Sequence, residues 1–201
     1  MKRVAQFVVI LGAFVFVAGL ISSRIRQFEQ NKTPQVVTTT TSIPTPTPIP
    51  ALLVIPKLKI KAQIDPVGLT STNNMDVPAD ASHVGWYMFG PMPSVRGNAV
   101  IAGHYDTPSG RPAIFYRLNR LVVGDTLDIE LNDGTLHTFV VTGKDIIATD
   151  VFPEDYVFGT KYGINLNLIT CNGVWDPVEK NYSKRLVVYA TLKGTQFGTF
   201  P

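Results

Sequence analysis

The 201-residue chain has one cysteine, Cys171, three histidines and few charged residues, which make up 16% of the sequence. A single thiol excludes an internal disulfide and any zinc site built from several cysteines. The sequence also shows no group of His, Cys and carboxylate residues at metal-ligand spacing, and no acidic cluster that predicts a calcium site. We therefore expect neither a metal nor another cofactor.

Basic charge is concentrated at the start of the chain. Residues 1–32 hold five Lys or Arg and one Glu, whereas the remainder holds 13 basic and 14 acidic residues. Binding to nucleic acid requires a concentrated basic surface, so the nearly neutral remainder is not expected to bind it.

An uncharged run, VAQFVVILGAFVFVAGLI, covers residues 4–21. As a helix it would measure about 27 Å, close to the thickness of a bilayer core, so it predicts a transmembrane signal anchor after a cytoplasmic tip of residues 1–3. A cleaved signal peptide is the alternative, but the following AGLISSRIR matches an A-x-A cleavage site poorly. Basic residues flank both ends of the run and favour an amino terminus inside the cell only weakly. We expect a single-pass protein of the cell membrane.

Residues 22–50 are rich in Thr and Pro toward their end, in VVTTTTSIPTPTPIP. This composition has no periodic apolar face and is typical of an extended linker. Residues 51–201 are long enough for one folded domain, which the predicted orientation places outside the cytoplasm.

The folded part has a mainly β pattern. Its segments alternate apolar and polar residues or are rich in β-branched residues, and Asn132-Asp133-Gly134 is typical of a hairpin turn. Strands are expected at Leu52–Ile64, Asn98–His104, Thr126–Leu131, Leu136–Ala148, Ile164–Cys171 and Leu186–Leu192. Short helices are expected near Ala113–Leu118 and Pro153–Phe158. The prediction is a closed or nearly closed β-barrel of about eight strands with short helices on its connections.

Strand alternation sets the direction of Cys171. In INLNLITC, the residues Ile164, Leu166 and Leu168 share the natural core face, so Cys171 lies on the opposite face unless a bulge intervenes. Arg185 lies opposite the apolar set of its own strand, RLVVYATL. His104 ends the apolar run GNAVIAGH. Each also has an ordinary interpretation: a buried structural cysteine, a solvated cation and a satisfied core histidine.

Together these three residues form a complete set for acyl transfer. A thiolate is a nucleophile, an imidazole can stabilise it or protonate a leaving amine, and a guanidinium can bind an oxyanion or position substrate carbonyls. A single cysteine with a distant histidine is a recognised pattern for a catalytic nucleophile.

The same residues resemble the sortases, membrane-anchored cysteine transpeptidases of bacterial surfaces. Leu168-Ile169-Thr170-Cys171 is similar to the strand end TLxTC of that family, with Arg185 fourteen residues later. GNAVIAGHYD is similar to the segment that ends in the family's histidine. PAIFYRL, VGDTLDIEL, FPEDYVFG and LITCNGVWD resemble class F sortases in particular. Asn167 departs from the pattern, because the family has threonine there.

The resemblance implies a function. Sortases cut LPxTG-like sorting signals between Thr and Gly, form a thioester on the cysteine, and transfer the acyl part to an amine on cell wall or protein. It implies Cys171 as nucleophile, His104 as acid and base, and Arg185 as the oxyanion and substrate ligand. The expected partners are surface proteins with such C-terminal signals and an amine acceptor from cell wall or pilin. The residues expected to bind substrate are Ile169, Thr170, Trp175 and Trp86. Asp106 either orients His104 or is an ordinary turn residue.

Two alternatives differ from this interpretation. An L,D-transpeptidase acting on peptidoglycan would have an arginine directly after a Gly-Cys-x pattern, whereas Cys171 is followed by Asn172-Gly173-Val174. A non-catalytic binding module held off the membrane would have a buried, inert Cys171, with His104 and Arg185 lying apart.

Overall fold

The computed structural model describes residues 47–160 and 162–194, which belong to one compact unit, Pro46–Pro201. No helix within these residues is both long and apolar enough to cross a membrane. The expected signal anchor at residues 4–21 and most of the expected linker lie outside the described residues.

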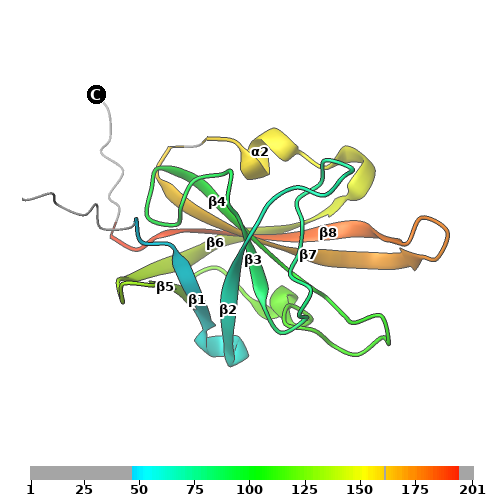
Figure 1. Cartoon of the computed structure of the whole chain (residues 1–201), viewed down its shortest axis with the longest axis horizontal. Helices are drawn as coiled ribbons and strands as arrows, with labels where there is room; N and C mark the ends of the chain where they lie inside the picture. The colour runs from blue at the N-terminus through cyan, green and yellow to red at the C-terminus, as the bar shows by residue number, and fades with distance from the viewer. Residues whose placement is uncertain (1–46, 161, 195–201) are drawn as a thin grey trace, which may run out of the picture. The chain divides into compact units, whose positions relative to one another are not determined.

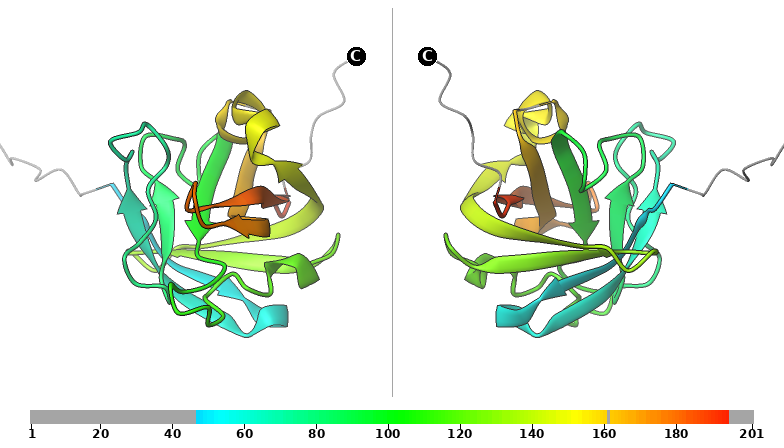
Figure 2. Two further views of the ribbon diagram at one scale, coloured as in Figure 1. Left: turned by 90° about the vertical axis from the view of Figure 1, so that its right-hand side faces the viewer. Right: turned by 90° about the vertical axis from the view of Figure 1, so that its left-hand side faces the viewer.

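Eight strands close into a barrel in the order β1-β2-β3-β4-β7-β8-β6-β5, with β5 pairing back to β1 (Figures 1 and 2). The strands are β1 (Pro50–Ile55), β2 (Ile60–Val67), β3 (Val84–Tyr87), β4 (Gly97–Gly103), β5 (Thr126–Leu131), β6 (Leu136–Ala148), β7 (Ile164–Asp176) and β8 (Asn181–Leu192). The short helices are η1 (Pro56–Leu58), η2 (Leu118–Arg120), η3 (Thr149–Val151) and α2 (Glu154–Phe158). The predicted closed β-barrel with short helices is confirmed.

Two local predictions were wrong. The expected strand at Leu52–Ile64 is two antiparallel strands, β1 and β2, separated by η1. The expected helix at Ala113–Leu118 is a set of turns that leads into η2, because its amides bond to the carbonyls of Ala81, Tyr105 and His104 rather than along a helix. Strand β3, which follows His83, was not among the strands expected from the sequence. That strand has four residues and pairs parallel to β2, so it shows too little alternation to be recognised from sequence.

Apolar residues pack on both faces of the sheet formed by β4, β7 and β8. Ala99, Ile101, Leu166 and Leu168 face the main core inside the barrel. On the outer face Val100, Ile169 and Val187 pack with Val157 of α2 in a second cluster. All seven residues of β4 are buried as a result. This double burial holds the ends of these strands on a rigid support.

Asparagine side chains fasten α2 to the outer face. Asn167 donates from Nδ2 to the Val157 carbonyl at 2.7 Å, and Asn98 donates to the carbonyls of Tyr156 and Val157 at 3.1 and 3.4 Å. Asn165 donates to the Asn98 side chain at 3.1 Å. The departure from the sortase pattern at Asn167 thus has a physical role, because an amide reaches the helix carbonyl as a donor.

We expect Asn167→Ala to destabilise the domain by about 1–3 kcal/mol, since it leaves the buried Val157 carbonyl without this donor. Chemical denaturation monitored by tryptophan fluorescence measures the change. The control is Asn119→Ala, an exposed position, for which we expect less than about 0.5 kcal/mol. Equal stabilities of the two variants would show that the asparagine contact does not hold α2.

Candidate functional site

The strand register brings Cys171, His104 and Arg185 into one row. β4 and β7 run parallel with Ala102 opposite Ile169, so continuing the register by two residues sets His104 beside Cys171. Cys171 pairs directly with Arg185 across the antiparallel β7 and β8. Because neighbouring strands lie about 4.8 Å apart, the three backbone positions lie within roughly 10 Å of one another. The predicted set therefore comes together on the outer face.

A bulge follows the cysteine rather than preceding it. The pairing of β7 with β8 shifts between Asn172 and Trp175. Gly173 has φ +87°, and a Cβ there would lie 2.5 Å from the Ser183 Oγ. Glycine is therefore required at this point, and the alternation that placed Cys171 on the outer face holds along the whole stretch from Ile164.

His104 is the first residue after β4, and a hydrogen bond from its imidazole ring to the backbone fixes the ring. Its Nε2 lies 2.9 Å from the Pro78 carbonyl oxygen. A carbonyl can only accept, so Nε2 carries the proton, and Nδ1 is the nitrogen that can exchange a proton with a reactant. The backbone beside it is packed tightly, because a Cβ on Gly103 would lie 2.5 Å from the Phe115 ring.

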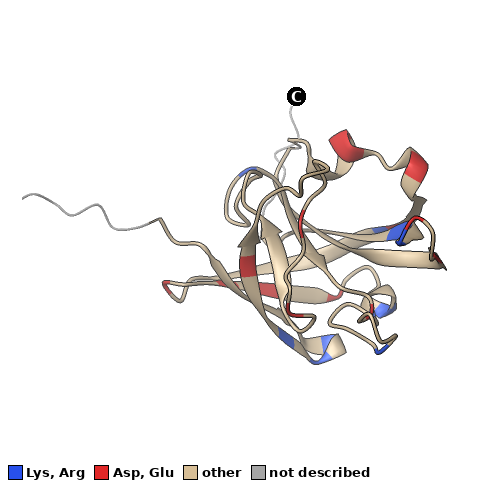
Figure 3. Ribbon diagram, turned by 45° about the vertical axis from the view of Figure 1, so that its right-hand side comes forward, with Lys and Arg blue, Asp and Glu red and all other residues tan. Residues whose placement is uncertain are grey.

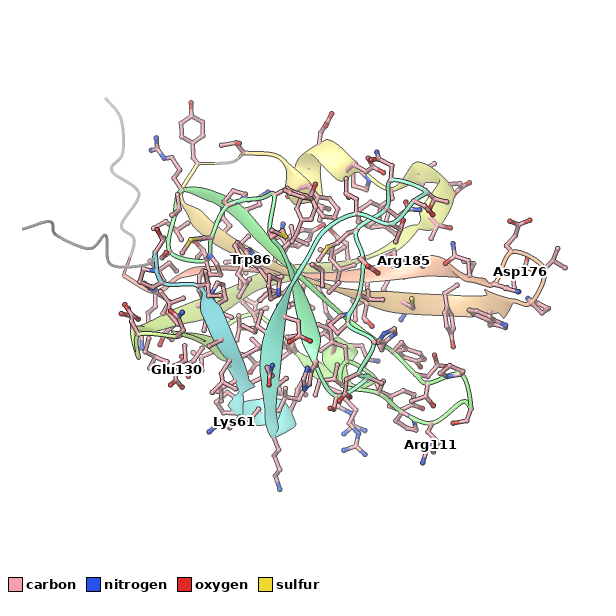
Figure 4. The ribbon with its side chains drawn as sticks, in the orientation of Figure 1. Lys61, Trp86, Arg111, Glu130, Asp176 and Arg185 are labelled. Atoms are coloured by element: carbon pink, nitrogen blue, oxygen red, sulfur yellow. The ribbon has the colours of Figure 1, made fainter. Side chains whose placement is uncertain are left out.

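Arg185 is fixed by three acceptors near the β7–β8 hairpin (Figure 4). Its Nη1 donates to the carbonyls of Tyr182 and Lys184 at 3.0 Å each, and its Nη2 donates to Asn181 Oδ1 at 2.7 Å. A guanidinium has five N–H donors, so this network fixes its position and still leaves donors for a substrate oxygen.

Opposing influences act on the thiol. Burial raises the pKa of Cys171, the positive charge of Arg185 lowers this pKa, and the negative charge of Asp106 raises it. The net effect is an increase above the value of a free thiol. The thiol is therefore mostly protonated at neutral pH, and Arg185 is the neighbour that favours the reactive thiolate.

Asp106 and a row of aromatic rings complete one side of the site. The Tyr182 hydroxyl donates to Asp106 Oδ2 at 2.5 Å, and this bond is the main cause that raises the pKa of Tyr182 to about 12. The Tyr182 ring lies 5.7 Å from Tyr105 and 5.2 Å from Trp175, and Tyr105 lies 4.9 Å from Tyr116. Sequence reasoning named Asp106 and Trp175 but missed Tyr105, Tyr116 and Tyr182, since these rings come from the β4–β5 connection and from β8.

The four residues predicted to bind substrate fall into different surroundings. Ile169 belongs to the outer-face cluster, and Trp175 is 48% exposed near the hairpin. Thr170 faces away from Cys171, is buried, and donates its hydroxyl to the Gly103 carbonyl at 2.8 Å. Trp86 lies in the main core and donates to the Pro91 carbonyl (Figure 4). Substrate contact stays a prediction for all four, and Trp175 is the most exposed of them.

Charged residues are scattered along the described ribbon and form no continuous basic face (Figure 3). Within residues 47–160 and 162–194, no three or more His, Cys, Asp or Glu side chains are grouped to hold a metal.

Comparisons with known proteins agree with this geometry. The family model described as the Sortase domain matches residues 53–193. No curated protein sequence matched the chain.

Many solved structures share the fold. Sortase A from Corynebacterium diphtheriae has a TM-score of 0.56 and 20% identity, over 77% of this chain and 64% of that one. Sortase C-1 from Actinomyces oris has a TM-score of 0.53 and 19% identity, over 70% and 72%. A pilus-related sortase C of Group B Streptococcus has a TM-score of 0.54 and 18% identity, over 74% and 68%. The chain thus covers less than two thirds of the C. diphtheriae protein, and these likenesses concern the fold.

We expect the rate of Cys171 alkylation by iodoacetamide to rise with pH through a pKa above that of a free thiol, because burial disfavours the thiolate. Arg185→Gln should move this profile to still higher pH, since it removes the charge that lowers the thiol pKa. Lys184→Gln, at the neighbouring exposed position, is the matched control and should leave the profile in place. Coincident profiles for wild type and Arg185→Gln would contradict this role of Arg185.

Proposed function

Because the chain belongs to the sortase family, we propose that it is a membrane-anchored cysteine transpeptidase that cleaves LPxTG-like sorting signals between Thr and Gly. The observation that carries the proposal is the row of His104, Cys171 and Arg185 across β4, β7 and β8. The acyl part would then be joined to an amine on cell wall or on another protein.

The first half of the reaction forms a thioester. The reaction starts once the Cys171 thiol has passed its proton to Nδ1 of His104. The resulting thiolate attacks the threonine carbonyl carbon, and the carbonyl oxygen becomes an oxyanion. When the oxyanion collapses, the bond to the glycine nitrogen breaks. Protonated His104 gives a proton to this departing amine, and its Nδ1 is the suitable nitrogen because Nε2 is bonded to the Pro78 carbonyl.

The second half resolves the thioester. A neutral amine attacks the thioester carbonyl, the bond from carbon to sulfur breaks, and Cys171 leaves as a thiolate. Neutral His104 takes the proton that the nitrogen loses. The enzyme returns to its starting protonation state, since the histidine gave up one proton in the first half and regained one in the second.

Arg185 serves both halves without changing its charge. The three acceptors around it hold its guanidinium in place before substrate arrives. A donor fixed in advance stabilises an oxyanion more than a mobile one, because no reorganisation accompanies the charge development. Its positive charge also favours the thiolate.

Membrane attachment and partners are part of the proposal. Residues 4–21 would anchor the chain in the cell membrane with the barrel outside the cytoplasm, joined by the linker of residues 22–50. The substrates would be surface proteins with C-terminal LPxTG-like signals, and the acceptor an amine of cell wall or pilin. The sequence motifs support class F among the sortases.

The alternatives explain the geometry less well. An L,D-transpeptidase would place its arginine directly after the cysteine, whereas here it comes from the neighbouring strand. A binding module has no need of His104 and Arg185 on either side of a thiol. Both alternatives remain outcomes of the experiment.

The test uses the full chain in detergent micelles, an LPATG-containing peptide and triglycine amide, followed by mass spectrometry. We expect a thioester on Cys171, cleavage between Thr and Gly, and an amine-dependent ligation product. Cys171→Ala should abolish turnover, and His104→Ala and Arg185→Ala should each reduce it by about 100-fold or more, with the fold retained by circular dichroism.

Other results would redirect the assignment. No thioester with a panel of LPxTG variants, in a chain whose thiol also resists alkylation, would support the binding module. No thioester with a readily alkylated thiol would mean that the enzyme acts on a different signal. Near-normal turnover in Arg185→Ala would remove Arg185 from the mechanism.

A further inference from the structure

Asp106 is the charged residue of the site that the acyl-transfer chemistry above does not use. It lies two residues beyond His104, past the end of β4. Asp106 thus lies beyond the C-terminal end of β4. The asparagines that bind α2, Asn98 on β4 and Asn167 on β7, lie nearer the N-terminal ends of their strands. The thiol therefore has α2 toward one side and Asp106 toward the other, as the separate positions of α2 and the β4–β5 connection in Figure 1 illustrate.

No cation neutralises Asp106 within the part of the chain that the structure describes. The ion pairs there are Lys57 with Asp125, and His83 with Asp65 and Asp80. The polar partner of the Asp106 carboxylate is the Tyr182 hydroxyl, which is neutral. Aromatic rings from the β4–β5 connection and from the ends of β7 and β8 frame it, and the outermost of them, Tyr116 and Trp175, are 40% and 48% exposed.

A carboxylate at this place works against the first half of the reaction. Its charge raises the pKa of the Cys171 thiol, and so opposes formation of the nucleophile. A negative charge beside the thiol becomes favourable when a positive charge arrives there, and the incoming amine brings one. An α-amine has a pKa of about 8, so most of it is ammonium at neutral pH.

We propose, on the basis of the proposed transpeptidase function, that Asp106 with the rings of Tyr105 and Tyr182 forms the subsite that receives the acceptor as a primary ammonium. The carboxylate attracts the ammonium, and the faces of aromatic rings attract cations as well. The docked ammonium loses one proton to solvent. The neutral amine then attacks the thioester, the bond from carbon to sulfur breaks, and His104 takes the second proton.

The experiment measures ligation by the full chain in micelles, starting from the LPATG-containing peptide. It compares triglycine amide, whose single charge is its ammonium, with hydroxylamine, which is uncharged at neutral pH. The readout for each is the concentration at which ligation is half-maximal. For Asp106→Asn we expect this concentration to rise about fivefold for triglycine amide, the loss typical of one partly screened ion pair, and to stay near the wild-type value for hydroxylamine.

Tyr182→Phe separates recognition from structure. It keeps the ring and frees the Asp106 oxygen that the hydroxyl now occupies, so the half-maximal triglycine amide concentration should fall. If Asp106 only tied the hairpin in place through Tyr182, this variant would behave like Asp106→Asn, and the proposal would be overturned. Asp106→Glu keeps the charge and should recover part of the loss, which gives a second test.

The outcomes distinguish failure of the ammonium subsite from failure of the proposed transpeptidase function. A wild-type chain that forms no thioester refutes the transpeptidase. A wild-type chain that forms one, while Asp106→Asn leaves the triglycine amide dependence unchanged, refutes the ammonium subsite alone. Equal losses for triglycine amide and hydroxylamine also refute it, because the uncharged nucleophile should not sense the carboxylate.

Discussion

The parallel pairing of β4 with β7 is the constraint on which the site depends. Parallel strands end at the same edge of a sheet, so the histidine after β4 and the cysteine on β7 lie side by side although they are far apart in the sequence. Next to them, the Thr170 hydroxyl of β7 donates to the Gly103 carbonyl of β4, 67 positions earlier in the chain. The antiparallel β8 then adds Arg185 opposite the thiol. A shift of one residue in either register would turn one of these side chains into the core.

Burial on two sides makes this register rigid. The barrel interior fixes one face of β4 and β7, and the cluster under α2 fixes the other. The asparagine tethers supply donors to α2 carbonyls that apolar packing would leave unpaired. Catalytic side chains at the ends of such strands need little reorganisation, since their backbone positions are set by packing alone.

Strand alternation predicted the closed barrel, and the set of His104, Cys171 and Arg185 was predicted from chemistry together with the resemblance of their segments to sortases. Alternation and resemblance did not reveal β3, which is too short to show a period, or the turns at Ala113–Leu118, whose amides bond to distant carbonyls. The contact of His104 with Pro78 and of Tyr182 with Asp106 also had no signal in the sequence. Such contacts depend on which loops meet over the barrel, and this follows from tertiary packing rather than local pattern.

The charges around the thiol are arranged for two successive steps rather than one. In the proposed reaction Arg185 favours the thiolate and stabilises the oxyanion of both steps. Asp106 disfavours the thiolate. In the proposed thioester the sulfur carries no charge, so the repulsion between it and the carboxylate is absent. From that moment the carboxylate faces a neutral thioester and can attract a cation without cost to the nucleophile. A site that must first release one amine and then accept another gains from opposite charges on its two sides, because the positive charge serves both steps and the negative charge serves the arrival of the second amine.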